Sequence, residues 1–308
     1  MELPFTGHEP VLLDETLELL SLRPGMTAVD CTVGRGGHSE HISRRLGRSG
    51  LLIVLDADLR NLEYARARLA DAPSQIRFLH ANFAELSDVL QTTGTSGVDA
   101  IFADLGLSTN QLFDEQYGLS FTRSMQLDMR IDSRLPTSAT DLVNKMSEQE
   151  LARVLYQLAQ ERYSRRIARK IVEARRIWPI TTTDRLADLV RSAIPSRGGA
   201  PPKIDPATKT FLALRIAVNH EVENLAGLLE QAPRHLNPGG RLAVISFQST
   251  EDRVVKREFR SAEQAGVLRV LTKKPLTPSE IELARNPRSR SAKLRVAQRS
   301  NAPLWNTT

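Results

Sequence analysis

Short apolar runs alternate with amphipathic stretches through the first third of the chain. The runs TAVD, LLIVLD, IRFLH and VDAIFAD occupy residues 27–30, 51–56, 76–80 and 98–104, and helical periodicity marks the segments between them. Parallel strands are usually joined by crossover helices, and strands covered on both faces are apolar almost throughout. The alternation therefore predicts an α/β fold with a parallel sheet and helices on both of its faces.

The alternation then stops. Helical periodicity instead marks four segments: 139–145, 148–159, 161–176 and 183–193. A helix over 208–231 is expected to return the chain to the sheet. Further strands are predicted at 241–247, 267–271 and 292–297. We therefore expect residues 1–113 and 208–308 to form one domain, into which residues 114–207 are inserted as an all-helical domain.

The composition is typical of a globular protein, with 41% hydrophobic and 25% charged residues among 308. No apolar run approaches the roughly 18 to 20 residues that cross a bilayer, and the N-terminus has no basic segment followed by an apolar one. Cys31 is the only cysteine, which excludes an internal disulfide and fits a reducing compartment. We expect a cytoplasmic protein in which Cys31 packs as a small residue rather than acting as a nucleophile.

The net charge of +6 is unevenly distributed. Residues 161–176 carry seven Lys or Arg against two Glu, and residues 285–299 carry six with no acid. Such clusters attract nucleic acid through its phosphates, although a solvated helix face explains a single cluster equally well. The residues predicted to hold phosphates are Arg165, Arg166, Arg169, Lys170, Arg288, Arg290, Lys293 and Arg295.

A glycine-rich segment, DCTVGRGG at 30–37, joins the first predicted strand to a helix. Glycines there let the backbone approach a ligand, and the helix start offers free N–H groups. Asp56 ends the second strand, 20 residues beyond Gly36, where a carboxylate can accept hydrogen bonds from a ribose. The loop alone is compatible with a plain tight turn; together with Asp56 it favours a nucleotide-type site.

Two kinds of cofactor use such a site. A dinucleotide fingerprint starting at Gly34 requires Gly or Ala at its sixth position, where this chain has Ser39. Acidic residues end the first and fourth strands, Asp30 and Asp104, and carboxylates favour a sulfonium cofactor that also carries an ammonium group. These differences favour S-adenosylmethionine over a nicotinamide dinucleotide.

Longer strings carry a more specific resemblance, which covers nearly the whole chain. They are HEPVLLDE (8–15), TVGRGGHS (32–39), DLGLSTNQL (104–112), GLSF (118–121), LDMRID (127–132), ERYSRRIARKIVEAR (161–175), DPATKTFLALRIAVNHE (205–221), ISFQSTEDRVVK (245–256) and NPRSRSAKLRVA (286–297). In this order they resemble the ribosomal RNA small subunit methyltransferase H family, bacterial enzymes that methylate the exocyclic amino nitrogen of a cytosine in 16S ribosomal RNA.

The resemblance implies a Rossmann-like class I S-adenosylmethionine-dependent methyltransferase with an inserted helical domain. It also implies cofactor contacts at Gly36, Gly37, His38, Asp56, Phe83, Asp104 and Gln111. The residues alone would assign Phe83 to core packing. The implied partner is small-subunit ribosomal RNA, in a small-subunit particle.

The chain departs from the family pattern at two histidines. Asp205 stands where the family usually has the His of His-Pro-Ala-Thr, and Gln248 stands where it has the His of His-Ser-Leu-Glu-Asp. Gln248 can donate and accept hydrogen bonds but cannot titrate. A role that requires an imidazole base at either position is therefore in doubt.

Transfer to a cytosine amino group needs that nitrogen oriented toward the methyl group, with acceptors for its hydrogens. Asp104 is the candidate catalytic residue, with the backbone carbonyls of Leu105 and Gly106 as further acceptors; the alternative is that Asp104 only holds the cofactor's ammonium group. The cationic cofactor drives transfer, so no metal is expected. The string Glu251-Asp252-Arg253 either lines the pocket or forms a helix cap with ion pairs.

Three other functions remain open from the sequence. The chain can be a cytosine amino-methyltransferase that acts on another RNA or on DNA. It can be a ribosome-assembly factor with an idle methyltransferase site, as the missing histidines suggest. The loop alone also allows a nicotinamide dehydrogenase. In the favoured interpretation the target base is single-stranded or flipped out, because a base inside a helix is unreachable.

Overall fold

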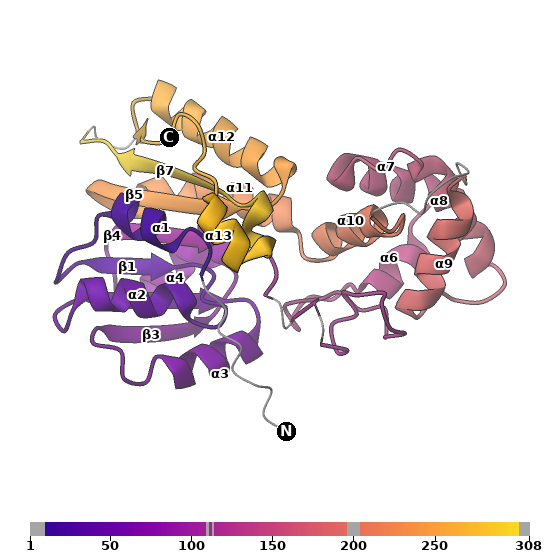
Figure 1. Ribbon diagram of the computed structural model, residues 1–308, viewed down its shortest axis with the longest axis horizontal. Helices are drawn as coiled ribbons and strands as arrows, with labels where there is room; N and C mark the ends of the chain where they lie inside the picture. Colours follow the sequence, from indigo (N-terminus) through magenta and orange to yellow (C-terminus); the bar gives the residue numbers. More distant parts are fainter. Residues whose placement is uncertain (1–9, 109–110, 113, 196–203, 302–308) are drawn as a thin grey trace. The chain divides into compact units, whose positions relative to one another are not determined.

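The computed structural model describes residues 10–108, 111–112, 114–195 and 204–301, and the chain forms two compact units (Figure 1). Unit 1 comprises Met1–Gly106 and Val222–Thr308, and unit 2 comprises Leu107–Glu221. His8, Glu9, Thr109 and Asn110 of the family-like strings lie outside the described residues. Within the described ranges, no helix is long and apolar enough to cross a membrane.

Unit 1 is built on a seven-stranded sheet in the order β3-β2-β1-β4-β5-β7-β6. The strands are β1 Thr27–Asp30, β2 Leu51–Asp56, β3 Gln75–His80, β4 Val98–Asp104, β5 Leu236–Ser246, β6 Leu268–Val270 and β7 Lys293–Arg299. The first five are parallel, as the alternation predicts, whereas β7 is antiparallel to both β5 and β6. The α/β fold is confirmed.

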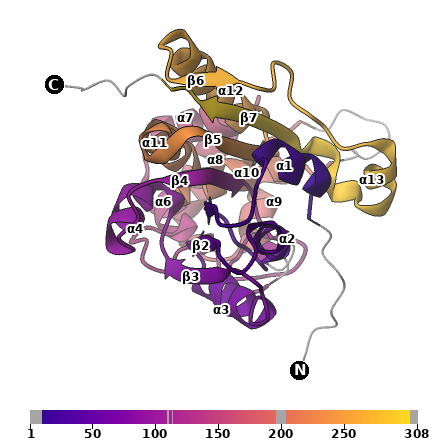
Figure 2. The same cartoon turned by 90° about the vertical axis from the view of Figure 1, so that its left-hand side faces the viewer.

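Helices cover both faces of this sheet because successive strand residues point to opposite sides. Leu52 and Val54 pack with α1 Leu13–Leu20, α2 Gly37–Leu46 and α3 Leu59–Arg68. Ile53 and Leu55 pack with α4 Leu86–Thr92, α11 Glu221–His235 and α12 Ser249–Gln264. Figure 2 shows α1 and α2 on one side of the strands and α4 and α11 on the other. The short elements η1 Phe83–Glu85, α13 Glu280–Arg285 and η2 Pro287–Ser291 complete the unit.

β5 starts earlier than its apolar pattern indicates. Val98 pairs with Leu236 and Ala100 pairs with Arg241, so residues 237–240, Asn-Pro-Gly-Gly, form a bulge within the strand. Gly239 has φ 82°, and a Cβ on Gly240 would lie 2.8 Å from the carbonyl oxygen of Asn237. The glycines thus permit a bulge where the sequence predicts only a loop before residue 241.

Unit 2 is helical. Its helices are α6 Ala139–Lys145, α7 Glu148–Ala159, α8 Ser164–Arg175, α9 Thr183–Ala193 and α10 Thr208–Val218. Leu151 and Leu155 of α7 are buried with Ile167 and Ile171 of α8 in a core separate from those of the sheet. The four helices predicted between 139 and 193 are thus present, with α8 shorter than expected.

The expected helix over 208–231 is two helices. Asn219 ends α10, because its side chain donates to the carbonyl of Met129 and accepts from the N–H of Ile131, both at 2.8 Å. His220 follows in the left-handed region with φ 49°. α10 therefore belongs to unit 2, and that unit extends over residues 107–221 instead of the expected 114–207.

Candidate functional site

Three acidic residues end neighbouring strands of unit 1. Asp30 is the last residue of β1, Asp56 of β2 and Asp104 of β4, and the sheet places β1 between the other two strands. Because these strands are parallel, their carboxyl ends lie at the same edge, where α/β proteins bind ligands. The arrangement brings together three carboxyl groups that are far apart in the sequence.

The glycine turn between β1 and α2 is fixed by backbone hydrogen bonds. The N–H of Val33 donates to the carbonyl of Leu55 at 2.8 Å, and that of Gly36 donates to the carbonyl of Val33 at 2.7 Å. Gly34 and Gly36 have φ 51° and 79°, values that other residues rarely adopt. No side chain caps the α2 start among the described residues, so the first N–H groups of α2 are available to a ligand.

Asp56 is tied to this turn. Its Oδ2 accepts from the N–H of Gly34 at 2.8 Å and from Nδ2 of Asn61 at 3.4 Å, and its Oδ1 accepts from the N–H of Asp58 at 2.8 Å. Burial raises its pKa to about 7, although the hydrogen bonds from Asp58 and Gly34 oppose the shift. Each carboxylate oxygen can still accept another hydrogen bond, so Asp56 can serve a ligand while it shapes the turn.

Asp30 is 1% exposed and has partners on both oxygens. Oδ2 accepts from the hydroxyl of Ser39 at 2.6 Å, and Oδ1 accepts from the N–H of Thr32 at 3.1 Å. Burial raises its pKa to about 6 against these hydrogen bonds. Asp30 therefore pins the strand end to α2 and places a further carboxyl group near Asp104.

Asp104 is held less completely. Its N–H donates to the hydroxyl of Thr32 at 2.7 Å, but its buried Oδ1 has no hydrogen-bond partner among the described residues. Burial, then the charges of Asp30 and Glu251, raise its pKa to about 8. A buried acceptor without a donor is costly. A ligand with N–H donors and positive charge would remove this cost.

His38 faces the other oxygen of Asp104. Its Nε2 lies 2.9 Å from the carbonyl of Val11, which can only accept, so Nε2 carries the hydrogen and Nδ1 a lone pair. Nδ1 is 3.6 Å from Oδ2 of Asp104. Burial lowers the pKa of His38 to about 4, although the Val11 carbonyl opposes the shift. At neutral pH the contact thus joins a neutral ring to a carboxyl group that holds its proton, and is not an ion pair.

Two predicted cofactor residues have other surroundings. Phe83 follows β3 as the first residue of η1 and is half-buried against the apolar cluster of the sheet, as the core-packing alternative expects. Gln111 belongs to unit 2, is 4% exposed, and its Oε1 accepts from the N–H of Ser108 at 3.0 Å. Their cofactor contacts remain predictions.

The string Glu251-Asp252 forms a cap with ion pairs. Oε2 of Glu251 accepts from the N–H groups of Phe247 and Gln248 at 2.9 and 3.0 Å, as part of a capping box at the start of α12. Oδ1 of Asp252 accepts from Nε of Arg295 at 2.6 Å. Glu251 also influences the pKa of Asp104, so its carboxyl group belongs to the electrostatic surroundings of the site.

The two positions that lack the family's histidines have structural partners. The side chain of Gln248 accepts a backbone hydrogen bond in the capping box of α12. Oδ1 of Asp205 accepts from the N–H of Ala207 at 2.8 Å, and its Oδ2 pairs with Arg191 at 2.8 Å. Both side chains therefore accept a hydrogen bond near the start of a helix, and this role does not require an imidazole.

The predicted phosphate-binding residues divide by exposure. Arg165, Arg166, Arg169 and Lys170 are exposed on α8, and Arg288 and Arg290 are exposed near η2. Lys293 is half-buried and lies 3.4 Å from Asp252. Arg295 is only 6% exposed and is paired with Asp252. The expectation that Arg295 offers its charge to phosphate therefore fails: β7 is an internal strand, and this side chain is used inside unit 1.

A model of the MraW methylase family matches residues 5–300. The chain belongs to this family. It is 48% identical over 300 residues to the ribosomal RNA small subunit methyltransferase H of Koribacter versatilis, covering 95% of this chain and 94% of that protein. Over 291 residues it is 46% identical to the protein of the same name from Solibacter usitatus, covering 94% and 99%. The resemblance drawn from the nine strings is confirmed.

Sequence reasoning missed the residues that hold the carboxyl groups at the strand edge. Ser39 holds Asp30 and Asn61 holds Asp56. The N–H of Thr32 donates to the carboxyl group of Asp30, and its hydroxyl accepts from the N–H of Asp104. Thr32 and Ser39 are the first and last residues of the string TVGRGGHS (32–39), where hydroxyl side chains soon after a strand-end acid were the available signal. Asn61 offers no such signal, because its place in the sequence shows only that it lies in a helix and not that it faces Asp56.

Proposed function

We propose that this chain transfers a methyl group from S-adenosylmethionine to the exocyclic amino nitrogen of a cytosine in small-subunit ribosomal RNA. The observation that carries the proposal is the strand edge of Asp30, Asp56 and Asp104 around a glycine turn. Within the described part of the chain, a buried oxygen of Asp104 has no hydrogen-bond partner there. The two relatives of this chain described above are both named ribosomal RNA small subunit methyltransferase H.

The residues of this edge suit the cofactor's functional groups. Asp56 ends β2, where its carboxyl group can accept from ribose hydroxyls, and the α2 start with Gly36 and Gly37 offers N–H groups to the cofactor's carboxylate. Asp104 offers its free oxygen to a positively charged group. When bound, S-adenosylmethionine supplies an electrophilic methyl group on a cationic sulfur. Phe83 and Gln111 complete the proposed cofactor set.

Asp104 has a second proposed role, as an acceptor for the cytosine amino group. The free protein keeps this carboxyl protonated at neutral pH, since its pKa is about 8. A nearby positive charge favours the ionised form, which can accept a hydrogen bond from the amino group and orient its lone pair. The carbonyls of Leu105 and Gly106 are further proposed acceptors. Gly106, at φ 140°, allows the chain to turn against Phe247, whose ring would lie 3.2 Å from an added Cβ.

The RNA is proposed to lie on the exposed basic residues of both units, in particular the four on α8 and Arg288 and Arg290. Their guanidinium and ammonium groups suit phosphates, and the acceptor base must leave any helix to reach the carboxyl edge. We further propose that the substrate is the assembled small-subunit particle. The assembly-factor alternative loses support, because Gln248 lies in the capping box of α12 and Asp205 accepts from the N–H of Ala207 just before α10.

The test is transfer of a labelled methyl group. Purified protein is incubated with methyl-labelled S-adenosylmethionine and either small-subunit particles or protein-free 16S RNA, and the RNA is digested to nucleosides. We expect N4-methylcytidine at a single cytosine, with particles preferred over free RNA. Label in another nucleoside would refute the acceptor assignment, and RNA binding without label would favour the assembly factor.

A further inference from the structure

A groove runs between α7 and α8 in unit 2. Arg153 and Tyr156 line it from α7, and Arg162, Arg165, Arg166 and Arg169 line it from the α8 side. Glu148 is the acidic residue in its lining, so arginines outnumber acids five to one there. A groove with this surplus attracts a polyanion.

The two helices that form the groove share a buried core. Leu151 and Leu155 of α7 are fully buried with Ile167 and Ile171 of α8. Between the helices, Gln160 has φ 51°, and the buried Glu161 accepts from the N–H of Tyr163 at 2.8 Å through Oε1. The turn between the two helices is therefore held by its own hydrogen bond.

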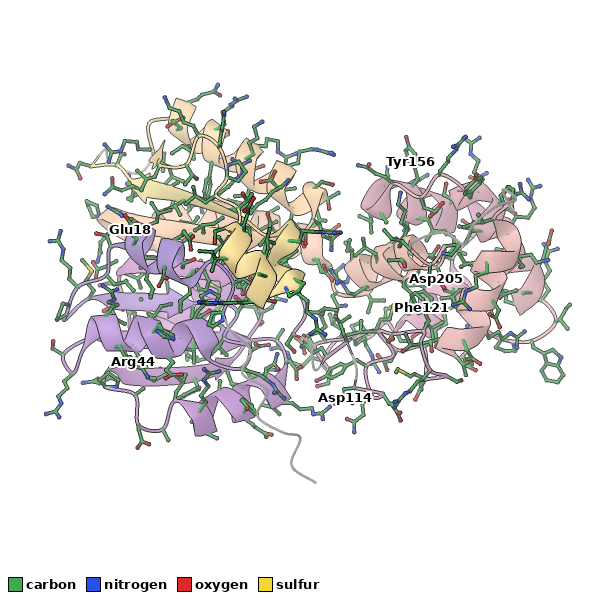
Figure 3. The ribbon with its side chains drawn as sticks, in the orientation of Figure 1. Glu18, Arg44, Asp114, Phe121, Tyr156 and Asp205 are labelled. Atoms are coloured by element: carbon green, nitrogen blue, oxygen red, sulfur yellow. The ribbon has the colours of Figure 1, made fainter. Side chains whose placement is uncertain are left out.

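Tyr156 supplies an aromatic surface in this groove. It is 63% exposed on α7, and Figure 3 labels it there. An aromatic ring that remains so exposed loses the free energy that burial would provide. A nucleic acid base is a suitable cover, because every base has a planar face that stacks on an aromatic ring. The ring and the arginines together match the two parts of a nucleotide.

The cations of the groove are accessible. Arg169 lies 3.6 Å from Glu148, but 68% and 42% of their side chains are exposed, so a phosphate can compete for this arginine. The guanidinium of Arg162 lies 5.7 Å from the ring centroid of Tyr163. Arg165 and Arg166 are exposed. Planar guanidinium groups match phosphate oxygens in a bidentate manner. The exposed ring of Tyr156 beside them favours RNA over an acidic protein, because RNA adds a base that stacks on the ring.

We propose that the α7–α8 groove binds an unpaired stretch of the ribosomal RNA substrate, with a base stacked on Tyr156 and its phosphates on Arg162, Arg165 and Arg166. The identity of the RNA rests on the proposed function. The nucleotide is unpaired, because a base inside a duplex does not expose its face to a side chain. The groove thus binds a segment of the RNA other than the methylated cytosine.

Full-length protein is titrated into a fluorescent single-stranded 12-nucleotide RNA, and anisotropy gives Kd. Tyr156→Ala should raise Kd roughly tenfold, and Tyr156→Phe should stay within about twofold because the ring remains. Arg166→Ala should raise Kd and make the slope of log Kd against log salt shallower by about 0.7, the value for one lost phosphate contact on a single strand. The matched control is Trp178→Ala, since Trp178 is an equally exposed aromatic residue of unit 2 at 68%.

The same variants are then tested for methyl transfer to small-subunit particles. Tyr156→Ala should raise KM with kcat nearly unchanged, and S-adenosylhomocysteine binding should be unaffected. The proposal is overturned if Tyr156→Ala and Trp178→Ala weaken RNA binding equally, or if crosslinks from the groove in the particle fall on protein instead of RNA. Wild-type protein that binds RNA through the groove but transfers no methyl group would refute the proposed function and leave this inference intact.

Discussion

The carboxyl edge of unit 1 and the basic face of α8 in unit 2 differ in how they are built. Asp30 is 1% exposed, and a buried oxygen of Asp104 has no partner among the residues that the structure describes, whereas Arg165 and Arg169 are exposed on α8. Burial makes each acid's protonation depend on its neighbours and on a bound ligand. An exposed arginine is charged under all conditions and is screened by salt. Substitutions at the edge should therefore change chemistry and pH dependence, and those on α8 should change affinity and salt dependence.

The largest expected effect is that of Asp104→Asn. The amide keeps the shape but cannot carry the negative charge that faces the cofactor and the amino group, so methyl transfer should fall about a thousandfold. Single-turnover transfer to small-subunit particles measures this loss. Unchanged transfer would remove Asp104 from catalysis.

The same variant, measured without cofactor, tests how burial of Asp104 affects stability. Because the folded protein raises the pKa of Asp104 from 3.8 to about 8, its stabilising contribution is lost as pH rises between these values. Asparagine has no charge to bury, so the midpoint of thermal unfolding should fall less with pH than in the wild type. Melting curves at pH 5.5 and 8.5 compare the two proteins.

Asp56→Asn should have the next largest effect. The amide oxygen can still accept hydrogen bonds, but the negative charge that strengthens bonds from ribose hydroxyls is lost. The N–H groups of Gly34 and Asp58 also lose a charged acceptor. S-adenosylhomocysteine should bind about 100-fold more weakly by calorimetry, since hydrogen bonds to charged groups are each worth about 1.5–3 kcal/mol. RNA affinity should not change. Asp71→Asn, at an exposed acid of unit 1, is the matched control.

The next largest expected effect is the pH dependence of cofactor binding. Below pH 8 the free protein holds a proton on Asp104, and a cationic ligand requires that proton to leave. Binding of S-adenosylmethionine should therefore tighten as pH rises from 6 to 8, by up to about tenfold for each pH unit, and then level off. Calorimetry in buffers of different ionisation enthalpy would detect the released proton. In Asp104→Asn this part of the pH dependence should disappear, and its persistence would assign it to Asp56 or Asp30.

The sheet edge was largely predictable from sequence, because each acid ends an apolar run. The runs at 27–30, 51–56 and 98–104 have the same first and last residues as β1, β2 and β4. Parallel strands then bring their last residues to one edge without further information. What the sequence did not reveal is which oxygen is satisfied. Only the geometry shows that Ser39 holds Asp30 while Oδ1 of Asp104 has no partner in the described ranges.

The basic regions were harder to interpret, because a count of charges does not distinguish an exposed arginine from a buried one. Arg290 and Arg295 belong to one string without acids, yet Arg290 is exposed and Arg295 pairs with Asp252. That pairing depends on α12 lying next to β7, a contact between distant segments. The boundary of unit 2 was missed for a related reason: the side chain of Asn219 breaks a helical pattern by bonding to residues 129 and 131.

The smallest expected effects test the difference between exposed and buried arginines within a single string. Arg290→Ala should weaken RNA binding only a few-fold and make the salt dependence shallower by roughly the contribution of one phosphate contact, with thermal stability unchanged. Arg295→Ala should do the reverse, because it leaves the largely buried Asp252 with Lys293 alone. It should lower the free energy of unfolding by about 1–3 kcal/mol and leave the salt dependence of RNA binding intact. Equal effects of the two substitutions on RNA affinity would show that burial in unit 1 does not decide which arginines contact the substrate.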